Sequence, residues 1–287
     1  MNLVLFEPAE LAAPLPLADP RAQHILKVLR RAPGDTFLAG LVDGPHGVAT
    51  LRSIDADTLS LAFAATHEPP ALPPITLIIG LPRPQTARDI LRDAATLGAA
   101  CIHFVATERS DPNYASATLW TSGEWRRHLL AGAAQACDTR LPALSWTHTL
   151  VSLLPALRNP YGYTMRDASA SGSGSSPAPA PSPARATPPS PPILPRPRLL
   201  ALDNYEATVS LAAALATAPR GPETPASPLS PPAVDPLVLA LGPERGWGPA
   251  DRAALRSAGF TLCSLGTRVL RLETAVTAAL ALALHSR

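Results

Sequence analysis

From residue 75 onward, short apolar runs alternate with longer amphipathic stretches. Continuous apolar runs are typical of strands buried on both faces, and amphipathic stretches are typical of helices that cover a sheet. The pattern predicts strands at 75–79, 101–105, 199–202, 237–241 and 260–265, and helices at 85–97, 124–136, 207–216, 249–258 and 274–284. This alternation indicates an α/β fold with a mostly parallel sheet and helices on both faces.

The pattern before residue 68 is different. Asp19 followed by Pro20 is typical of a helix start, and the apolar spacing extends this predicted helix to Arg31. Three β-favouring runs, at 36–41, 47–54 and 58–62, are separated by turn signals and predict a small antiparallel sheet or barrel. Residues 69–74 are rich in proline and predict an extended linker. We therefore expect a domain at 1–68 and a second at 75–287.

Proline accounts for 35 of the 287 residues, and much of it falls in two segments, 168–198 and 219–236. Proline makes up about 5% of the residues of an average protein, so this chain is rich in it. The two segments lack the apolar residues needed to offset the entropy of ordering, so we expect disordered inserts. A proline-rich motif for a partner is the less favoured alternative.

The net charge is only +2, so any nucleic-acid partner must be recognised by local clusters. The densest cluster comprises Arg21, Lys27, Arg30, Arg31 and Arg52. It is either a solvated face or a platform for phosphates, and His24 within it is more typical of a packed residue than of a catalytic one.

Other features exclude several classes of function. The cysteines Cys101, Cys137 and Cys263 lie far apart, so we expect buried thiols in a reducing compartment and no metal site. No apolar run reaches the length of a membrane span. The first residues are typical of a strand and not of a signal peptide, so we expect a cytoplasmic protein.

Two turns are the strongest candidates for a ligand site. One is Gly242-Pro243-Glu244-Arg245-Gly246, and the other runs from Leu265 to Ala275. Each follows a predicted strand and precedes a helix, where open α/β sheets usually bind ligands. The first turn has neither the dinucleotide nor the P-loop spacing, so it does not indicate a nucleotide-phosphate cradle.

Together the turns resemble the RsmE family of 16S ribosomal RNA uridine N3-methyltransferases, members of the SPOUT class. That family typically carries a Gly-Pro-Glu-Gly-Gly turn and then Leu-Gly-x-Arg-Ile/Val-Leu-Arg-x-Glu-Thr-Ala. The matching residues of the second motif are Leu265, Gly266, Arg268, Val269, Leu270, Arg271, Glu273, Thr274 and Ala275. Thr107 to Ser110 is similar to the family's Ser-Glu-Arg turn, and His24 to Arg30 is similar to its basic motif. The resemblance covers nearly the whole chain except the inserts.

The resemblance implies a SPOUT-type trefoil knot in the second domain and a PUA-like β-barrel in the first. It also implies a homodimer that methylates N3 of a uridine in 16S ribosomal RNA or the small subunit. S-adenosylmethionine would be bound by Leu241, Gly242, Pro243, Glu244, Gly246, Leu265, Gly266, Val269, Leu270, Arg271, Thr274 and Ala275.

Catalytic and RNA-binding roles are also implied by the resemblance. The catalytic candidates are Arg268, Arg271 and Glu273, and none of them stands out as a general base. Arg268 and Arg271 are candidates because a neighbouring cation can stabilise an anion that develops on the base. Glu273 could instead be only an acid near a helix start. The RNA-binding candidates are Arg21, His24, Lys27, Arg30, Arg31 and Arg109.

One position departs from the family pattern: Arg245 stands where the family usually has glycine. If that position needs a positive φ or a close approach to the ligand, arginine disfavours cofactor binding. The alternatives are a side chain that points outward toward RNA, or an RNA-binding homologue without catalytic activity.

Overall fold

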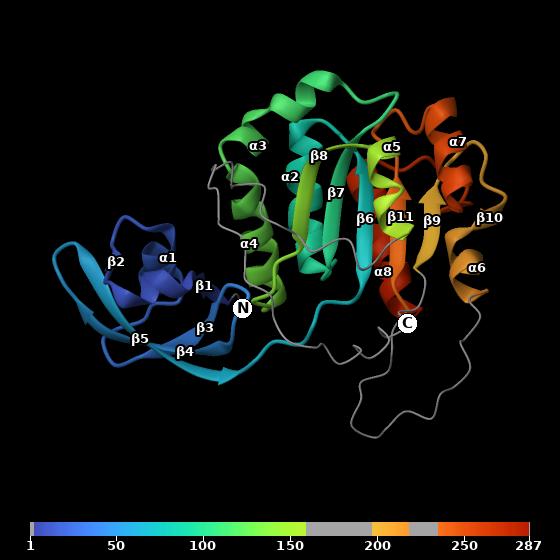
Figure 1. Ribbon diagram of the computed structural model, residues 1–287. Coiled ribbons are helices and arrows are strands. Elements are labelled where there is room, and N and C mark those ends of the chain that lie inside the picture. The colour runs from blue at the N-terminus through green and yellow to red at the C-terminus, as the bar shows by residue number, and fades with distance from the viewer. Residues whose placement is uncertain (1–2, 159–196, 218–234, 287) are drawn as a thin grey trace, which may run out of the picture.

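The computed structural model describes residues 3–158, 197–217 and 235–286. Two sheets organise these residues, one of five strands and one of seven (Figure 1). Residues 168–196 and 219–234, which make up most of the two expected inserts, lie outside the described residues. The α/β architecture expected from the alternating pattern is confirmed by the larger sheet.

The smaller sheet has the strand order β1-β3-β4-β5-β2. Its strands are β1 (Val4–Phe6), β2 (Leu15–Pro16), β3 (Thr36–Leu41), β4 (His46–Ile54) and β5 (Thr58–His67). The pairs β3–β4 and β4–β5 are antiparallel, as predicted, while β1 pairs with β3 in parallel. Its apolar face packs into a separate core that includes Phe6, Ile25, Leu51 and Leu59.

The first helix begins where the sequence predicts. The Asp19 carboxylate accepts a hydrogen bond from the backbone N–H of Arg21 at the start of α1 (Pro20–Gln23). The expected single α-helix to Arg31 is wrong, because the chain changes to a π-helical turn, η2 (His24–Val28). The N–H of Leu29 bonds to the carbonyl of His24, five residues back, and Arg30 then takes a φ of 53°.

The larger sheet is parallel throughout its described strands, in the order β10-β12-β9-β11-β6-β7-β8. The strands are β6 (Ile75–Gly80), β7 (Cys101–Ala106), β8 (Ala143–Thr149), β9 (Arg198–Leu202), β10 (Val209–Ser210), β11 (Leu237–Leu241) and β12 (Thr261–Ser264). The predicted helix at 207–216 is shorter than expected, because Ser210 caps α6 (Leu211–Ala216) and β10 precedes it.

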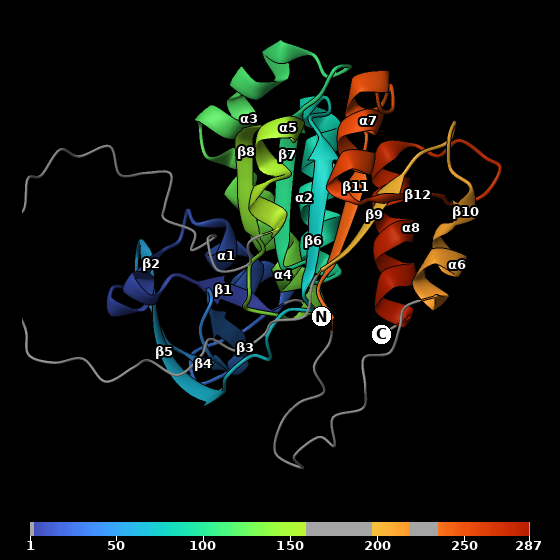
Figure 2. The same ribbon diagram turned by 45° about the vertical axis from the view of Figure 1, so that its right-hand side comes forward.

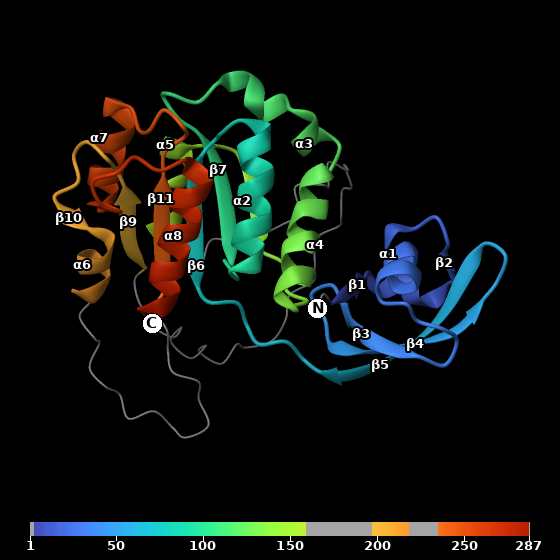
Figure 3. The ribbon, with the colours of Figure 1, turned by 180° about the vertical axis from the view of Figure 1, so that it is seen from behind.

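Helices cover both faces of this sheet (Figures 1 and 3). One face carries α2 (Pro84–Thr96), α4 (Glu124–Ala136), α6 and α8 (Leu272–His285), whose apolar residues share one core. The other carries α5 (Leu150–Leu153) and α7 (Pro249–Ala258) over a second core. The short helix α3 (Thr118–Thr121) lies beyond the end of α4. No helix in the described part of the chain is long and apolar enough to cross a membrane.

The strand order brings the ends of three strands together. Strand β12 lies between β10 and β9 near one edge of the sheet (Figure 2), yet the helix that follows it, α8, packs against α2. The segment after β12 must therefore cross back over the sheet. Because the strands are parallel, the carboxyl ends of β9, β11 and β12 share one edge, and the crossing segment lies above it.

The two sheets are joined through α4. The N–H of Leu3 bonds to the carbonyl of Ala134 in α4, and Leu3, Leu5 and Val42 pack against Ala133 in a small apolar cluster. The Thr139 hydroxyl, after α4, donates to the carbonyl of Gly44 at 2.6 Å. Apolar packing and hydrogen bonds together hold the smaller sheet against α4 and the segment that follows it.

Candidate functional site

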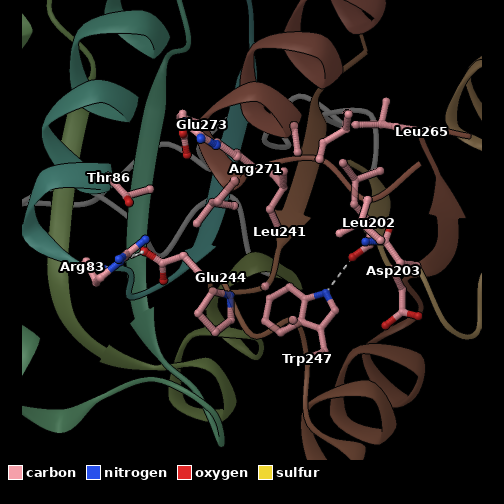
Figure 4. A pocket seen from close by; sticks show the side chains of 18 of the residues that line it. Arg83, Thr86, Leu202, Asp203, Leu241, Glu244, Trp247, Leu265, Arg271 and Glu273 are labelled. Atoms are coloured by element: carbon pink, nitrogen blue, oxygen red, sulfur yellow. Dashed lines mark hydrogen bonds and ion pairs between the residues drawn. The ribbon is translucent and has the colours of Figure 1, made fainter. Parts of the chain in front are cut away.

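A cavity of about 750 Å³ lies at the carboxyl edge of the larger sheet (Figure 4). It is enclosed by the turns after β9 and β11, the segment after β12, and the first turn of α2. Its volume falls within the range of small-molecule and cofactor sites. The two turns that the sequence analysis selected as a ligand site therefore lie at the edge of the sheet where the cavity forms.

The turn after β11 is shaped by two glycines. A Cβ on Gly242 would lie 2.8 Å from the carbonyl carbon of Gly246 and from the Trp247 nitrogen, so a side chain there would force the turn apart. Gly246 adopts a φ of 68°, which glycine takes without strain. The Trp247 ring, 1% exposed, donates from Nε1 to the carbonyl of Leu202 at 2.8 Å and so ties this turn to the end of β9.

Glu244 connects the same turn to α2. Its Oε1 accepts a hydrogen bond from the backbone N–H of Arg83 at 3.0 Å and lies 3.4 Å from the Arg83 Nε. Figure 4 shows the two side chains together at one wall of the cavity. The contact fixes the carboxylate of Glu244 through a charge-assisted bond at the residue preceding the helix.

The segment after β12 provides positive charge. Gly266 has a φ of 116°, and the residues from Gly266 to Arg271 are exposed. Within the described residues, no carboxylate forms an ion pair with Arg268 or Arg271, although both line the cavity. Their guanidinium groups can therefore bind an anion that enters the site.

Glu273 lies in the first turn of α8, also at the cavity wall. The other carboxylates of the lining pair with arginines: Asp89 with Arg92, Asp203 with Arg252 and Glu244 with Arg83. No ion pair within the described residues involves Glu273. Among the carboxylates of the cavity lining, Glu273 is thus the one without an ion pair to a described residue.

The turn after β9 is held by a buried ion pair that the sequence analysis missed. The Asp203 Oδ2 lies 2.6 Å from the Nε of Arg252 in α7, and their side chains are only 1% and 7% exposed. The other Asp203 oxygen accepts bonds from the N–H groups of Tyr205 and Glu206, at 2.7 and 2.6 Å. Both oxygens of the Asp203 carboxylate are therefore bonded, one to α7 and the other to the backbone of the turn, and this fixes the turn.

The structure brings together most residues of the two predicted turns. Those that line the cavity are Leu241, Gly242, Pro243, Glu244, Gly246, Leu265, Arg268, Val269, Leu270, Arg271, Glu273 and Ala275. Gly266 and Thr274 do not line it. The lining residues outside the two predicted turns include Arg83, Thr86, Asp203, Tyr205 and Trp247. The sequence could have indicated these residues through their position after β6, β9 and β11, because ligands bind at the carboxyl ends of parallel strands.

Arg245 does not line this cavity. Its side chain is exposed, and it is not among the described non-glycine residues with a positive φ, which are Arg30, Asp43 and Cys137. The backbone strain that would disfavour arginine at this position is therefore absent. Of the two orientations considered from the sequence, the structure has the outward one.

The basic residues predicted to bind RNA fall into different environments. Lys27, Arg30 and Arg31 are exposed, and they lie in the part of the chain that forms the smaller sheet. Arg109 follows β7 and donates a hydrogen bond to the carbonyl of Arg245 at 2.9 Å. His24 is partly buried, and its Nε2 has no hydrogen-bond partner among the described residues.

Arg21 forms contacts with residues around the smaller sheet. Its guanidinium bonds to Glu10 at 2.6 Å and to Asp19 at 2.7 Å, and it lies 5.2 Å from the centre of the Phe6 ring. The bonds to Asp19 and Glu10 raise the pKa of Arg21 and lower those of the two carboxyls. These contacts support a structural role for Arg21.

The cysteines provide no metal site in the described part of the chain, where no group of three or more metal-ligating side chains occurs. Cys263 is buried and Cys101 is partly buried, and burial raises both thiol pKa values to about 12. The expectation of a buried thiol is wrong for Cys137, which is exposed at the C-terminal end of α4.

Comparison with known proteins gives consistent matches. A family model described as RNA methyltransferase domain matches residues 68–174 and 200–284. Ribosomal RNA small subunit methyltransferase E of Treponema pallidum is 30% identical over 288 residues, which cover 99% of this chain and 91% of that protein. The protein of the same name from Synechocystis is 24% identical over 282 residues, and the alignment covers 98% of this chain and 76% of that protein.

A solved structure has the same fold. It is ribosomal RNA small subunit methyltransferase E from Neisseria gonorrhoeae, bound to S-adenosyl methionine. It aligns with a TM-score of 0.61 and 20% identity, over 98% of this chain and 95% of that chain.

Proposed function

Because the chain belongs to the ribosomal RNA small subunit methyltransferase E family, we propose that it uses S-adenosylmethionine to methylate N3 of one uridine in 16S ribosomal RNA. The observation that carries this proposal is the cavity at the ends of β9, β11 and β12. It combines glycine turns, which allow close approach to backbone groups, with two arginines and one carboxylate that form no ion pair within the described residues.

The cavity fits S-adenosylmethionine in size and in chemistry. Backbone groups of the turns at 202–205, 241–246 and 265–271 would hold the cofactor, and Gly242 lets the middle turn close, because a Cβ there would meet the backbone of Gly246 and Trp247. When bound, the cofactor supplies an electrophilic methyl group. The buried Trp247 and the Glu244 contact to Arg83 keep the turn after β11 in one shape, which reduces the entropy lost on binding.

The side chains of the cavity suit a reaction at an imide nitrogen. Uridine N3 must lose a proton before or during attack on a methyl group, and negative charge then spreads onto the base. Arg268 and Arg271 would stabilise that charge, because neither guanidinium pairs with a described carboxylate. Glu273 would accept the proton as general base. The alternative for Glu273, an acid that only favours the start of α8, predicts little change in the pH dependence of methyl transfer when it is replaced by glutamine.

The remaining features of the family belong to the same proposal. The return of the chain from β12 to α8 supports a trefoil-knotted arrangement, and the smaller sheet supports a PUA-like RNA-binding domain at 1–68. The exposed Val269 and Leu270, at 81% and 36%, support a homodimer that covers the crossing segment. Lys27, Arg30, Arg31 and Arg109 would contact RNA phosphates, in the cytoplasm where ribosomes are assembled.

The alternative proposal, an RNA-binding homologue without catalytic activity, rests on Arg245 and on the two proline-rich inserts, most of which lie outside the described residues. The outward position of that side chain removes the steric reason for it.

A direct experiment separates the two proposals. Purified protein is incubated with small ribosomal subunits from a strain that lacks this gene and with cofactor carrying a labelled methyl group, and the labelled nucleotide is mapped. We expect one labelled uridine, methylated at N3. Cofactor binding without transfer to any rRNA substrate would favour the inactive homologue, and label on another atom would reject the N3 assignment.

A further inference from the structure

Tyr205 is a large aromatic residue at the cavity that no part of the proposed reaction uses. It lies in the turn after β9, lines the cavity and is 75% exposed. Aromatic side chains are usually buried at least in part, because burying their surface is favourable. A tyrosine held in an exposed position at the edge of a site is a candidate for contact with a ligand.

The backbone of Tyr205 is fixed. Its N–H donates to the Asp203 carboxylate at 2.7 Å, and the same carboxylate is bonded to the buried Arg252 at 2.6 Å. The backbone that carries the ring is therefore held in place, and a ligand that stacks on the ring loses less entropy than one that must order a mobile loop.

One face of the ring is already covered. The Arg252 guanidinium lies 5.3 Å from the ring centre, within the range of a cation–π contact. Because Arg252 is buried, it must lie on the inner side of the ring. The outer face is then the one that contributes most of the exposed surface of Tyr205.

The ring also borders the turn predicted to hold the cofactor. A Cβ added to Gly246 would lie 3.9 Å from the Cε2 of Tyr205, so the ring edge lies near that turn, one side-chain atom away from contact. A flat group stacked on the outer face would therefore sit beside the cofactor turn without entering it.

We propose that Tyr205 is the stacking platform for the target base, holding the flipped-out uracil of the RNA against its outer face. The inference rests on the proposed function. Enzymes that act on a base must take it out of its stack, and aromatic side chains then replace the lost stacking partners. The 75% exposure favours a base delivered from solvent by RNA over the adenine of an enclosed cofactor.

The test begins with wild-type protein, which must bind S-adenosylmethionine and methylate rRNA. Failure at that step rejects the proposed function and not the role of Tyr205 specifically. The test then uses Tyr205→Ala and Tyr205→Phe, with an RNA fragment centred on the mapped uridine and a matched fragment abasic at that position. Thermal unfolding checks that both variants fold as the wild type does.

Stacking predicts a specific pattern. Tyr205→Ala should weaken binding of the intact fragment about tenfold, whereas Tyr205→Phe should stay within about twofold of wild type. On the abasic fragment, Tyr205→Ala and wild type should bind equally, because the partner of the ring is gone. The dissociation constant of S-adenosylmethionine should change less than about twofold in both variants.

Three results would overturn the proposal. Unchanged binding of the intact fragment by Tyr205→Ala would mean that the ring contacts no base. The abasic site and Tyr205→Ala each weaken RNA binding. If the two losses of binding free energy add when they are combined, the ring contacts another nucleotide. Weaker cofactor binding with unchanged RNA binding would assign the ring to the adenine of the cofactor.

Discussion

The Nη1 of Arg109 donates a hydrogen bond of 2.9 Å to the backbone carbonyl of Arg245. The two residues are 136 positions apart in sequence, one after β7 and the other in the turn after β11. Because the acceptor is a main-chain group, the bond holds the shape of the turn whatever side chain stands at position 245. Arginine can therefore occupy a place where the family usually has glycine.

This bond predicts that Arg109 supports cofactor binding indirectly. Arg109→Ala should weaken S-adenosylmethionine binding about fivefold, the effect of losing about 1 kcal/mol of hydrogen-bond stabilisation in the turn. Arg245→Ala is the matched control, because it keeps the carbonyl and should leave the affinity within about twofold. Isothermal titration calorimetry measures both. Equal losses in the two variants would mean that the Arg245 side chain itself contacts the cofactor.

Arg245 should instead affect RNA. Arg245 is exposed and stands between two cavity-lining residues, Glu244 and Gly246, so we expect Arg245→Ala to weaken rRNA binding with little effect on the cofactor. If the contact is to a phosphate, the slope of log affinity against log salt should fall by about 1. Filter binding over a salt series measures the slope. An unchanged slope with unchanged affinity would leave Arg245 outside the RNA interface.

The glycine turn makes a third prediction. Gly242→Ala places a Cβ 2.8 Å from the backbone of Gly246 and Trp247, so the turn must open and cofactor affinity should fall at least about tenfold. Gly123→Ala is the control: Gly123 has a φ of 76° and open space around its Cβ. That change should cost about 1 kcal/mol of stability but leave cofactor binding unaltered. Wild-type affinity in Gly242→Ala would show that the turn is not the binding surface.

Local sequence signals account for the elements that the sequence analysis located correctly. The helix at Pro249–Ala258 has a proline at its start and Gly259 in a left-handed conformation just past its end, and its bounds agree with the prediction. The apolar run at Leu237–Leu241 is also a strand with the predicted bounds, buried at every position. These elements carry their start, stop and burial signals within a few residues.

The features that were not predicted from the sequence depend on residues that lie far apart along the chain. The ion pair of Asp203 and Arg252 joins residues 49 positions apart, and neither position is distinctive in the sequence. The strand β10 has only two residues and is defined by its pairing with β12. The π-helical turn at His24–Val28 replaces an α-helix that local propensity favours, which is a tertiary effect on a short segment.

The buried pair gives a fourth prediction. Arg252→Ala leaves the Asp203 carboxylate buried without its main partner and should lower the free energy of unfolding by about 3–5 kcal/mol. Arg256→Ala is the control on the same helix, because its pair with Glu206 is exposed and should contribute at most about 1 kcal/mol. Urea denaturation at constant pH measures both. A loss below about 1 kcal/mol for Arg252→Ala would mean that water reaches Asp203.

The last prediction concerns stability against pH and the buried His103. Burial, together with the nearby His148, lowers the pKa of His103 to about 4, and Ser145 lies 2.7 Å from its Nδ1. Because the unfolded state keeps a pKa near 6.5, it binds the proton first as the pH falls. Stability from the neutral ring is therefore present above pH 6.5 and is lost between about pH 6.5 and 4.

The maximum effect of His103 is on the order of 3 kcal/mol, because its pKa falls from 6.5 to about 4 on folding. We expect the free energy of unfolding of the wild type to fall more steeply from pH 7 to pH 4.5 than that of His103→Gln, which has no proton to gain in this range. Urea denaturation at several pH values gives the difference between the two curves. If the free energies of unfolding of the wild type and His103→Gln fall in parallel with pH, the prediction is wrong. His103 would then gain its proton in the folded protein without disturbing the packing between β7 and β8.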